Sequence, residues 1–267
     1  MRSLFGTERP IIGLLHLHAL PGDPFFDEHA GVGGVAAAAR NDLAALQDGG
    51  VDAILVTNEF SVPYQKRVSP VTAAAMSYVI GNLASQIRVP FGAEVIYDGD
   101  ATMDVCAATG AQFTRCVFTD VWAGDLGLID RDVASTIRHK HDLRLDDLRL
   151  FYFVTSEGET NLGQRSTAEL IDSLAFNCKP DAYVVGGSAA GMAPDTELLR
   201  ELGDVAGATP VVAGTGCRPD TVASVLAAAH GAFVGTSIKV DGKIWNPVDR
   251  ARVHAFMELA RIARGDE

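Results

Sequence analysis

The chain has 267 residues, 48% of them hydrophobic and 21% charged, a balance that excludes intrinsic disorder and fits one large α/β domain. The 22 Lys and Arg residues against 34 Asp and Glu give a formal net charge of −12, which argues against nucleic acid or an anionic membrane as a partner. No apolar run reaches the roughly 18 residues of a transmembrane helix, and residues 1–6 lack the apolar core of a secretory signal. We therefore expect a cytoplasmic protein with no membrane span, whose four widely spaced cysteines are thiols rather than disulfides or zinc ligands.

Short β-branched runs alternate with longer Ala- and Leu-rich stretches, which is typical of a parallel sheet connected by helices. Ser166 and Glu169 have the spacing of a capping box and mark the start of one of the helices. In chain order the pattern predicts strand 11–18, helix 35–47, strand 52–58, helix 72–86, strand 91–96, helix 101–109, strand 113–118, helix 131–141, strand 150–155, helix 167–177, strand 182–186, helix 195–202, strand 210–213, helix 219–229, strand 232–235 and helix 247–264.

Eight strand-then-helix units within roughly 250 residues predict a single (β/α)8 TIM barrel. The alternative is a doubly wound open sheet, but no GxGxxG sequence follows the first strand. No linker or low-complexity tract divides the chain, so residues 1–267 are expected to form one domain.

The active site of a TIM barrel lies at the carboxyl ends of its strands, and glycines follow both of the last two predicted strands. Glycine lets main-chain N–H groups approach an anion closely, and nearby hydroxyls add donors. The alternative is that these glycines only make tight turns and that Lys239, which follows the last strand, lies on the surface. The predicted phosphate-binding residues are Gly214, Thr215, Gly216, Gly235, Thr236, Ser237 and Lys239.

His16 and His18 end the first predicted strand, where residues two apart share a face, so both imidazoles are expected at the barrel mouth. Imidazole titrates near neutrality, which suits a general acid or base. A zinc site is disfavoured because the fifth and sixth strands carry no histidine to complete it. The remaining interpretation is that a histidine only caps the packed barrel interior.

Further polar residues are expected at the same rim. Glu94 lies in an otherwise apolar strand, where it is either a carboxylate of raised pKa or the partner of Arg115 in a buried ion pair. No lysine lies on the fifth or sixth strand, so a Schiff-base aldolase is disfavoured. The candidate catalytic residues besides the histidines are Glu59, Glu94, Arg115 and Asp120, and the candidate substrate contacts are Asn58 and Glu157.

These motifs, taken in order, resemble the BtpA family, also called the BtpA/SgcQ family. The similar stretches are residues 12–24, with the sequence IGLLHLHALPGDP, and residues 50–60, 108–115, 235–242 and 245–253. The resemblance implies a TIM barrel close to phosphate-binding barrels. Some members are linked to photosystem I biogenesis, while others look like components of sugar-utilisation operons. It carries over the polar positions His16, Asn58, Glu59, Arg115, Thr236, Lys239, Asp241, Asn246 and Asp249.

Three departures from the family pattern lie at the mouth. Glu94 and Asp98-Gly99-Asp100 stand where the family usually has an Asn-rich third strand and an Asn-Asp pair. Residues 154–159 read VTSEGE where the family commonly has Asp-Val-x-x-Lys-His, and His18 is atypical. The substrate or even the reaction is therefore expected to differ from that of other members.

Together these observations predict a cytoplasmic enzyme that acts on a small phosphorylated sugar or related metabolite by proton transfer, as an isomerase, an epimerase or a lyase without a Schiff base. A divalent metal ion is a further candidate cofactor, and a homo-oligomer a candidate assembly. The alternatives are an enzyme that hydrolyses a phosphorylated nucleoside or sugar, and a non-catalytic assembly factor.

Overall fold

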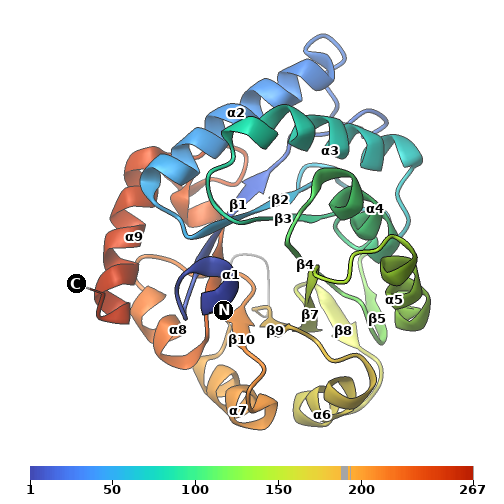
Figure 1. Cartoon of the computed structure of the whole chain (residues 1–267), viewed down its shortest axis with the longest axis vertical. Helices are drawn as coiled ribbons and strands as arrows, with labels where there is room; N and C mark the ends of the chain where they lie inside the picture. The colour runs from blue at the N-terminus through green and yellow to red at the C-terminus, as the bar shows by residue number, and fades with distance from the viewer. Residues whose placement is uncertain (188–191, 193, 267) are drawn as a thin grey trace.

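Eight parallel strands close into a barrel in the computed structural model, which describes residues 1–187, 192 and 194–266 (Figure 1). Each strand pairs with the next one around the barrel, and β1 pairs with both β2 and β11, so the sheet has no open edge. The fold is therefore the predicted (β/α)8 TIM barrel. Around the barrel the strands are β1 (Ile11–His16), β11 (Ala232–Val234), β10 (Val211–Ala213), β9 (Ala182–Val185), β7 (Arg149–Thr155), β4 (Phe113–Cys116), β3 (Phe91–Glu94) and β2 (Ala53–Thr57).

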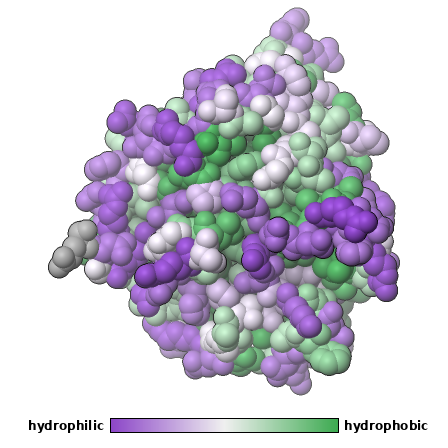
Figure 2. Space-filling view, in the orientation of Figure 1, coloured by the Kyte–Doolittle hydropathy of each residue, from purple (hydrophilic) through white to green (hydrophobic). Residues whose placement is uncertain are grey.

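Helices surround the barrel and cover the outer face of the strands (Figure 1). The predicted capping box is present, with Ser166 and Glu169 bonded reciprocally at the first turn of α6. In the space-filling view, hydrophilic residues cover most of the periphery and hydrophobic ones show between them and toward the centre (Figure 2). The outer helices are α2 (Gly31–Gly49), α3 (Pro70–Leu83), α4 (Gly99–Thr109), α5 (Val133–Asp142), α6 (Thr167–Asn177), α7 (Thr196–Ala206), α8 (Val222–Ala228) and α9 (Arg250–Arg264).

The core consists of two apolar clusters because successive strand residues point to opposite faces. One cluster packs strands against helices, and the other fills the barrel interior. A short helix that the sequence did not predict, α1 (Arg2–Phe5), contributes to the interior. The ring of Phe5 lies 5.2 Å from Phe113 and 6.3 Å from Phe151, centroid to centroid, so α1 packs on the interior rings of β4 and β7.

A second, three-stranded antiparallel sheet lies outside the barrel, and the sequence did not predict it either. The hairpin β5 (Val121–Gly124) and β6 (Gly127–Asp130) follows β4, and β8 (Glu159–Asn161) follows β7 and pairs with β5. Trp122 and Ile129 are buried and pack with the interior cluster, which anchors the hairpin on the barrel. The small sheet therefore joins the two loops that follow β4 and β7 at the carboxyl end of the barrel.

Two sequence predictions differ from the structure at the amino end of the chain. The first strand ends at His16 and not at His18. The first outer helix, α2, begins at Gly31, before the predicted start at residue 35.

The four cysteines are unpaired thiols. Across the described ranges we find no helix that combines the length and apolarity needed to span a bilayer.

Candidate active site

A polar layer lies at the carboxyl end of the barrel interior, above apolar layers. Strand register pairs His16 with Thr57, and Thr57 with Glu94. Arg115 belongs to the same layer because it lies two residues after Phe113, which faces Gly92 on the neighbouring strand. Each of these residues follows an inward-facing residue by two positions, so strand periodicity points its side chain inward.

Glu94 and Arg115 form a buried ion pair, one of the two arrangements that the sequence left open. The Arg115 Nε atom lies 3.0 Å from Glu94 Oε2, and its Nη1 atom donates to the Gly214 carbonyl oxygen at 2.7 Å. The guanidinium carbon lies 4.3 Å from the centroid of the Phe233 ring. Burial raises the pKa of Glu94, and the guanidinium opposes that rise. Arg115 thus links β4 to the end of β10 through the barrel interior.

His16 is buried, yet neither of its ring nitrogens has a hydrogen-bond partner in the described part of the chain. Its Nε2 atom lies 3.7 Å from Glu59 Oε2, beyond hydrogen-bond distance. Burial lowers the pKa of His16 to about 4, while the Glu59 carboxylate opposes that shift. The imidazole is therefore neutral at pH 7 and has unused hydrogen-bonding capacity.

Lys239 and His18 both lie near the ring of Phe60 but differ in exposure. Lys239 is 1% exposed, and its Nζ atom lies 5.2 Å from the centroid of the Phe60 ring. Burial lowers the pKa of Lys239, and the carboxylates of Asp42 and Glu59 oppose that shift. His18 lies beyond the end of β1 and is exposed, so it does not share the inward direction of His16.

Two glycine-containing loops predicted to bind phosphate lie side by side: residues 214–217 after β10 and residues 235–237 after β11. The Ser237 hydroxyl donates to the Cys217 carbonyl oxygen at 3.1 Å, which joins the loop after β11 to the loop after β10. Gly216 has a φ of +67°, a conformation that favours glycine. The main-chain N–H groups of Gly216, Thr236 and Ser237 donate to no other described residue. These two loops are called the glycine corners below.

The glycine corners also touch the polar layer. A Cβ atom at Gly235 would lie 2.9 Å from His16 Cε1, so the absence of a side chain there makes room for the imidazole. At Gly214 a Cβ atom would lie 2.7 Å from Val184 Cγ1, and the Gly214 carbonyl accepts from Arg115. Both corners are thus packed directly against residues of the candidate site.

Glu157 and two tyrosines complete the rim. Among the described residues, the Glu157 Oε1 atom is buried without a hydrogen-bond partner, and burial raises the pKa of this carboxyl while the Thr215 hydroxyl opposes the rise. The Tyr64 hydroxyl donates to the Glu59 carbonyl oxygen at 2.9 Å, and the Tyr97 hydroxyl donates to the Glu159 carboxylate. Neither tyrosine was predicted from the sequence, although Tyr97 directly follows the third predicted strand and so lies at a strand end like the other candidates.

Asn58 and Asp120 are bound to other parts of the protein. Asn58 is 1% exposed, and its side-chain oxygen accepts from the Ile96 N–H at 2.8 Å, which holds the end of β2 against the loop after β3. The Asp120 carboxylate accepts from Asn161 Nδ2 at 2.8 Å and pairs with Arg165. In this structure Asp120 thus fixes the small sheet.

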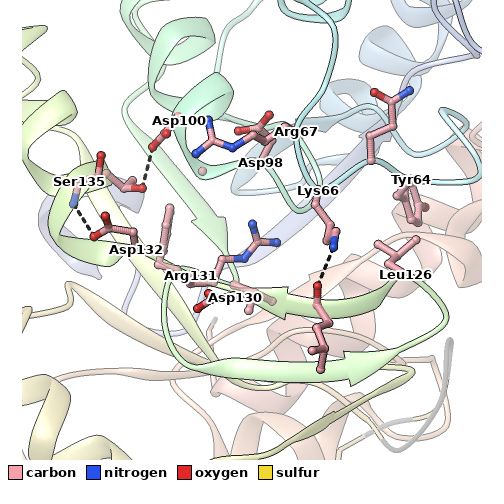
Figure 3. Close-up of a pocket in the computed structure, with 16 residues that line it drawn as sticks. Tyr64, Lys66, Arg67, Asp98, Asp100, Leu126, Asp130, Arg131, Asp132 and Ser135 are labelled. Carbon is pink, nitrogen blue, oxygen red and sulfur yellow. Dashed lines mark hydrogen bonds between the residues drawn. The ribbon is translucent and has the colours of Figure 1, made fainter.

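Two cavities open around the rim. One has a volume of about 710 Å³ and lies between the segment before α3, the loop after β3, the hairpin and the start of α5 (Figure 3). The other, of about 460 Å³, is lined by His18, Phe25, Phe60 and Trp245. In the described ranges no group of three or more His, Cys, Asp and Glu side chains is arranged to hold a metal ion.

Comparisons with known proteins agree with the fold and define the family. The native KDPGal structure superposes with a TM-score of 0.59 at 15% identity, over 98% of this chain and 99% of that one, a likeness that shows the fold alone. The sgc region protein SgcQ of Escherichia coli K12 is 42% identical over 264 residues, which cover 99% of this chain and 98% of SgcQ.

The photosystem I biogenesis protein BtpA of a Synechocystis species is 31% identical over 257 residues, which cover 95% of this chain and 88% of that protein. Residues 7–262 match the BtpA family as a whole. The chain is therefore a member of the BtpA family.

Proposed function

We propose that this protein is an enzyme that acts on a phosphorylated sugar or a related small metabolite by proton transfer next to a carbonyl group. One observation carries the proposal: the backbone of Gly235, in one of the glycine corners, is packed against the imidazole of His16, which has no hydrogen-bond partner among the described residues. A phosphate held at the glycine corners would bring the adjoining carbons of its sugar beneath His16 and Glu59.

The glycine corners supply donors suited to a phosphate. The N–H groups of Gly216, Thr236 and Ser237 have no partner among described residues, and the corners are joined at 3.1 Å through Ser237 and Cys217. Main-chain N–H groups gathered in a concave turn bind oxyanions without any charged side chain. The position also matches the phosphate site that many TIM barrels build after their seventh and eighth strands.

The polar layer supplies the groups for proton transfer. A neutral imidazole at His16 can donate a hydrogen bond to a carbonyl oxygen as negative charge develops on it. A carboxylate then takes the proton from the neighbouring carbon, and Glu59, 3.7 Å from His16, is the candidate. Arg115 and Glu94 form the charged floor of the site, and Glu157 contacts substrate from the opposite rim. The resulting enediolate is an intermediate that isomerases, epimerases and lyases have in common.

Deuterium exchange tests the proposal without knowledge of the final product. The protein is incubated in D2O with a panel of ketose phosphates, and NMR follows deuterium at the carbon next to the carbonyl. We expect exchange for a phosphorylated member of the panel and not for its unphosphorylated counterpart. His16→Gln should slow the exchange by about 10²–10⁴-fold. The matched control, His254→Gln, changes an imidazole of α9 whose side chain is 63% exposed and should exchange at the wild-type rate.

A second candidate is a non-catalytic assembly factor, which the name of the cyanobacterial relative suggests. Such a protein is expected to have rim side chains that satisfy one another, as Arg115, Glu94 and the Gly214 carbonyl do. The nitrogens of His16 and the Oε1 atom of Glu157, which have no partner in the part of the chain that the structure describes, favour the enzyme instead. No exchange, together with no rise in melting temperature for any sugar phosphate, would favour the assembly factor.

A further inference from the structure

The larger cavity lies on the far side of the barrel mouth from the glycine corners. It is lined by the segments that follow β2, β3 and β4, whereas the glycine corners follow β10 and β11. In the order of strands around the barrel, β3 lies four positions from β10, and β4 four positions from β11. The cavity and the glycine corners therefore face each other across the proposed site.

Tyr64 connects the cavity to that site. Its side chain lines the cavity, and its hydroxyl donates to the main chain of Glu59 at 2.9 Å. Val117, also in the lining, belongs to the apolar cluster of the barrel interior. Tyr64 and Val117 thus place the cavity next to the proposed site.

Arg131 brings buried hydrogen-bond donors without partners among the described residues to this cavity. Its Nε and Nη2 atoms are buried and have no hydrogen-bond partner in the described part of the chain. Figure 3 shows Arg131 entering the cavity from the hairpin side, while Lys66 and Arg67 enter from the segment before α3. Arg131 as a whole is half-buried, but two buried N–H groups without partners are unfavourable for folding, and an oxyanion is a natural partner for them.

Most carboxylates around the cavity are already bound to the protein itself. Asp98 accepts from the Val68 and Ala101 N–H groups at 2.7 and 3.1 Å, and Asp100 accepts from the Thr136 hydroxyl at 2.7 Å. Asp132 caps α5 by accepting from the Ser135 N–H at 3.0 Å. Asp130 is exposed at the end of the hairpin. Three of the four carboxylates thus have internal donors, whereas Arg131 pairs with none of the four.

We infer that this cavity is a second oxyanion subsite, in which Arg131, with Lys66 and Arg67 beside it, binds the end of the substrate that is distal to the phosphate. The inference rests on the proposed function and narrows the substrate class. It points to a metabolite with an anionic group at each end, such as a phosphorylated sugar acid or a sugar bisphosphate. The planar guanidinium fits a carboxylate and a phosphate equally well, so the distal group belongs to either class.

Calorimetric titration with three probes tests this inference. Ribose 5-phosphate has one anionic end, 6-phosphogluconate has a phosphate and a carboxylate, and fructose 1,6-bisphosphate has two phosphates. We expect the wild-type protein to bind at least one two-ended probe about tenfold or more tightly than ribose 5-phosphate. Whichever two-ended probe binds more tightly identifies the distal group as carboxylate or phosphate.

Three variants separate the two subsites. Arg131→Met should remove the advantage of the two-ended probe and leave the affinity for ribose 5-phosphate within about twofold of wild type. Arg138→Met, the matched control, changes an exposed arginine on α5 outside the cavity lining and should alter no affinity. Thr236→Val removes a hydroxyl from a glycine corner and should weaken all three probes by a similar factor.

The melting temperature distinguishes a ligand-binding arginine from a purely structural one, because replacing a structural arginine would lower it. Because Nε and Nη2 of Arg131 have no partner among the residues that the structure describes, Arg131→Met should melt at or above the wild-type temperature while it loses the distal oxyanion. A clear fall in melting temperature, or equal affinity of the variant and the wild type for two-ended probes, would overturn the inference. In the second case, retained binding of ribose 5-phosphate leaves the proposed function standing. If no probe binds the wild-type protein, both fail.

Discussion

Two arginines near the barrel mouth differ in how completely the protein satisfies them. Arg115 bonds to Glu94 at 3.0 Å and to the Gly214 carbonyl at 2.7 Å, and it lies over the ring of Phe233. Arg131 has two buried nitrogens that lack a partner in residues 1–187, 192 and 194–266, as His16 does. The bonded Arg115 stabilises the fold, whereas the buried nitrogens of Arg131 and His16 lower its stability. The difference separates a group that stabilises the fold from groups that we propose contact a ligand.

Removing the satisfied arginine should have the largest effect on stability. Arg115→Met leaves the buried carboxylate of Glu94 without its partner, so we expect the free energy of unfolding to fall by about 3–5 kcal/mol in urea titrations. The double variant Arg115→Met/Glu94→Gln should recover much of that loss, because no buried charge then remains unpaired. A loss below about 1 kcal/mol in the single variant would contradict the comparison between the two arginines.

Acid titration tests the unsatisfied imidazole. The pKa of His16 is lowered to about 4 in the folded protein from 6.5, so between these values the unfolded chain binds a proton that the folded one does not. Stability is therefore lost as the pH falls from about 6.5 to 4, by up to about 3 kcal/mol from this group. His16→Gln removes this contribution, so the difference in unfolding free energy between variant and wild type should change across that window. Parallel curves would show that His16 is not held neutral by burial.

The hydrogen bond between the glycine corners should have the smallest effect. Ser237→Ala removes the 3.1 Å bond to the Cys217 carbonyl and should lower the free energy of unfolding by about 1 kcal/mol. It should also weaken sugar-phosphate binding several-fold, because the two corners are then less firmly joined. Ser224→Ala, the control, removes a bond within the turn that starts α8 and should not affect binding. Equal affinities for the two variants would argue against the corners as one site.

The barrel was predictable because the sequence patterns that specify its strands and helices are local. Strands covered on both faces are continuous apolar runs, and the Ser166–Glu169 capping box operates within one helical turn. The small sheet was not predictable because β5 and β6 have four residues each and β8 has three. Its pairing of Trp122 with Asn161 joins segments that no local pattern connects. Phe5 was missed for the same reason, since its partners Phe113 and Phe151 are distant in sequence.

The candidate site was predictable where strand register determines it. The pairing of Glu94 with Arg115 follows from adjacent parallel strands, and this contact is present. The prediction that strand alternation places His18 on the face of His16 was wrong, because β1 ends at His16, although both rings contact Phe60. Arg131 was missed because it follows a hairpin and not a barrel strand, and its importance lies in what it does not contact.

The small sheet has a consequence for protein engineering by loop grafting. TIM-barrel loops are commonly regarded as interchangeable modules on a constant frame. Here β5 pairs with β6 on one side and with β8 on the other, so the loops after β4 and β7 are two halves of one unit. Transplanting either loop alone would leave an unpaired strand edge, a known cause of aggregation. Successful chimeras of this barrel will need to carry both loops together.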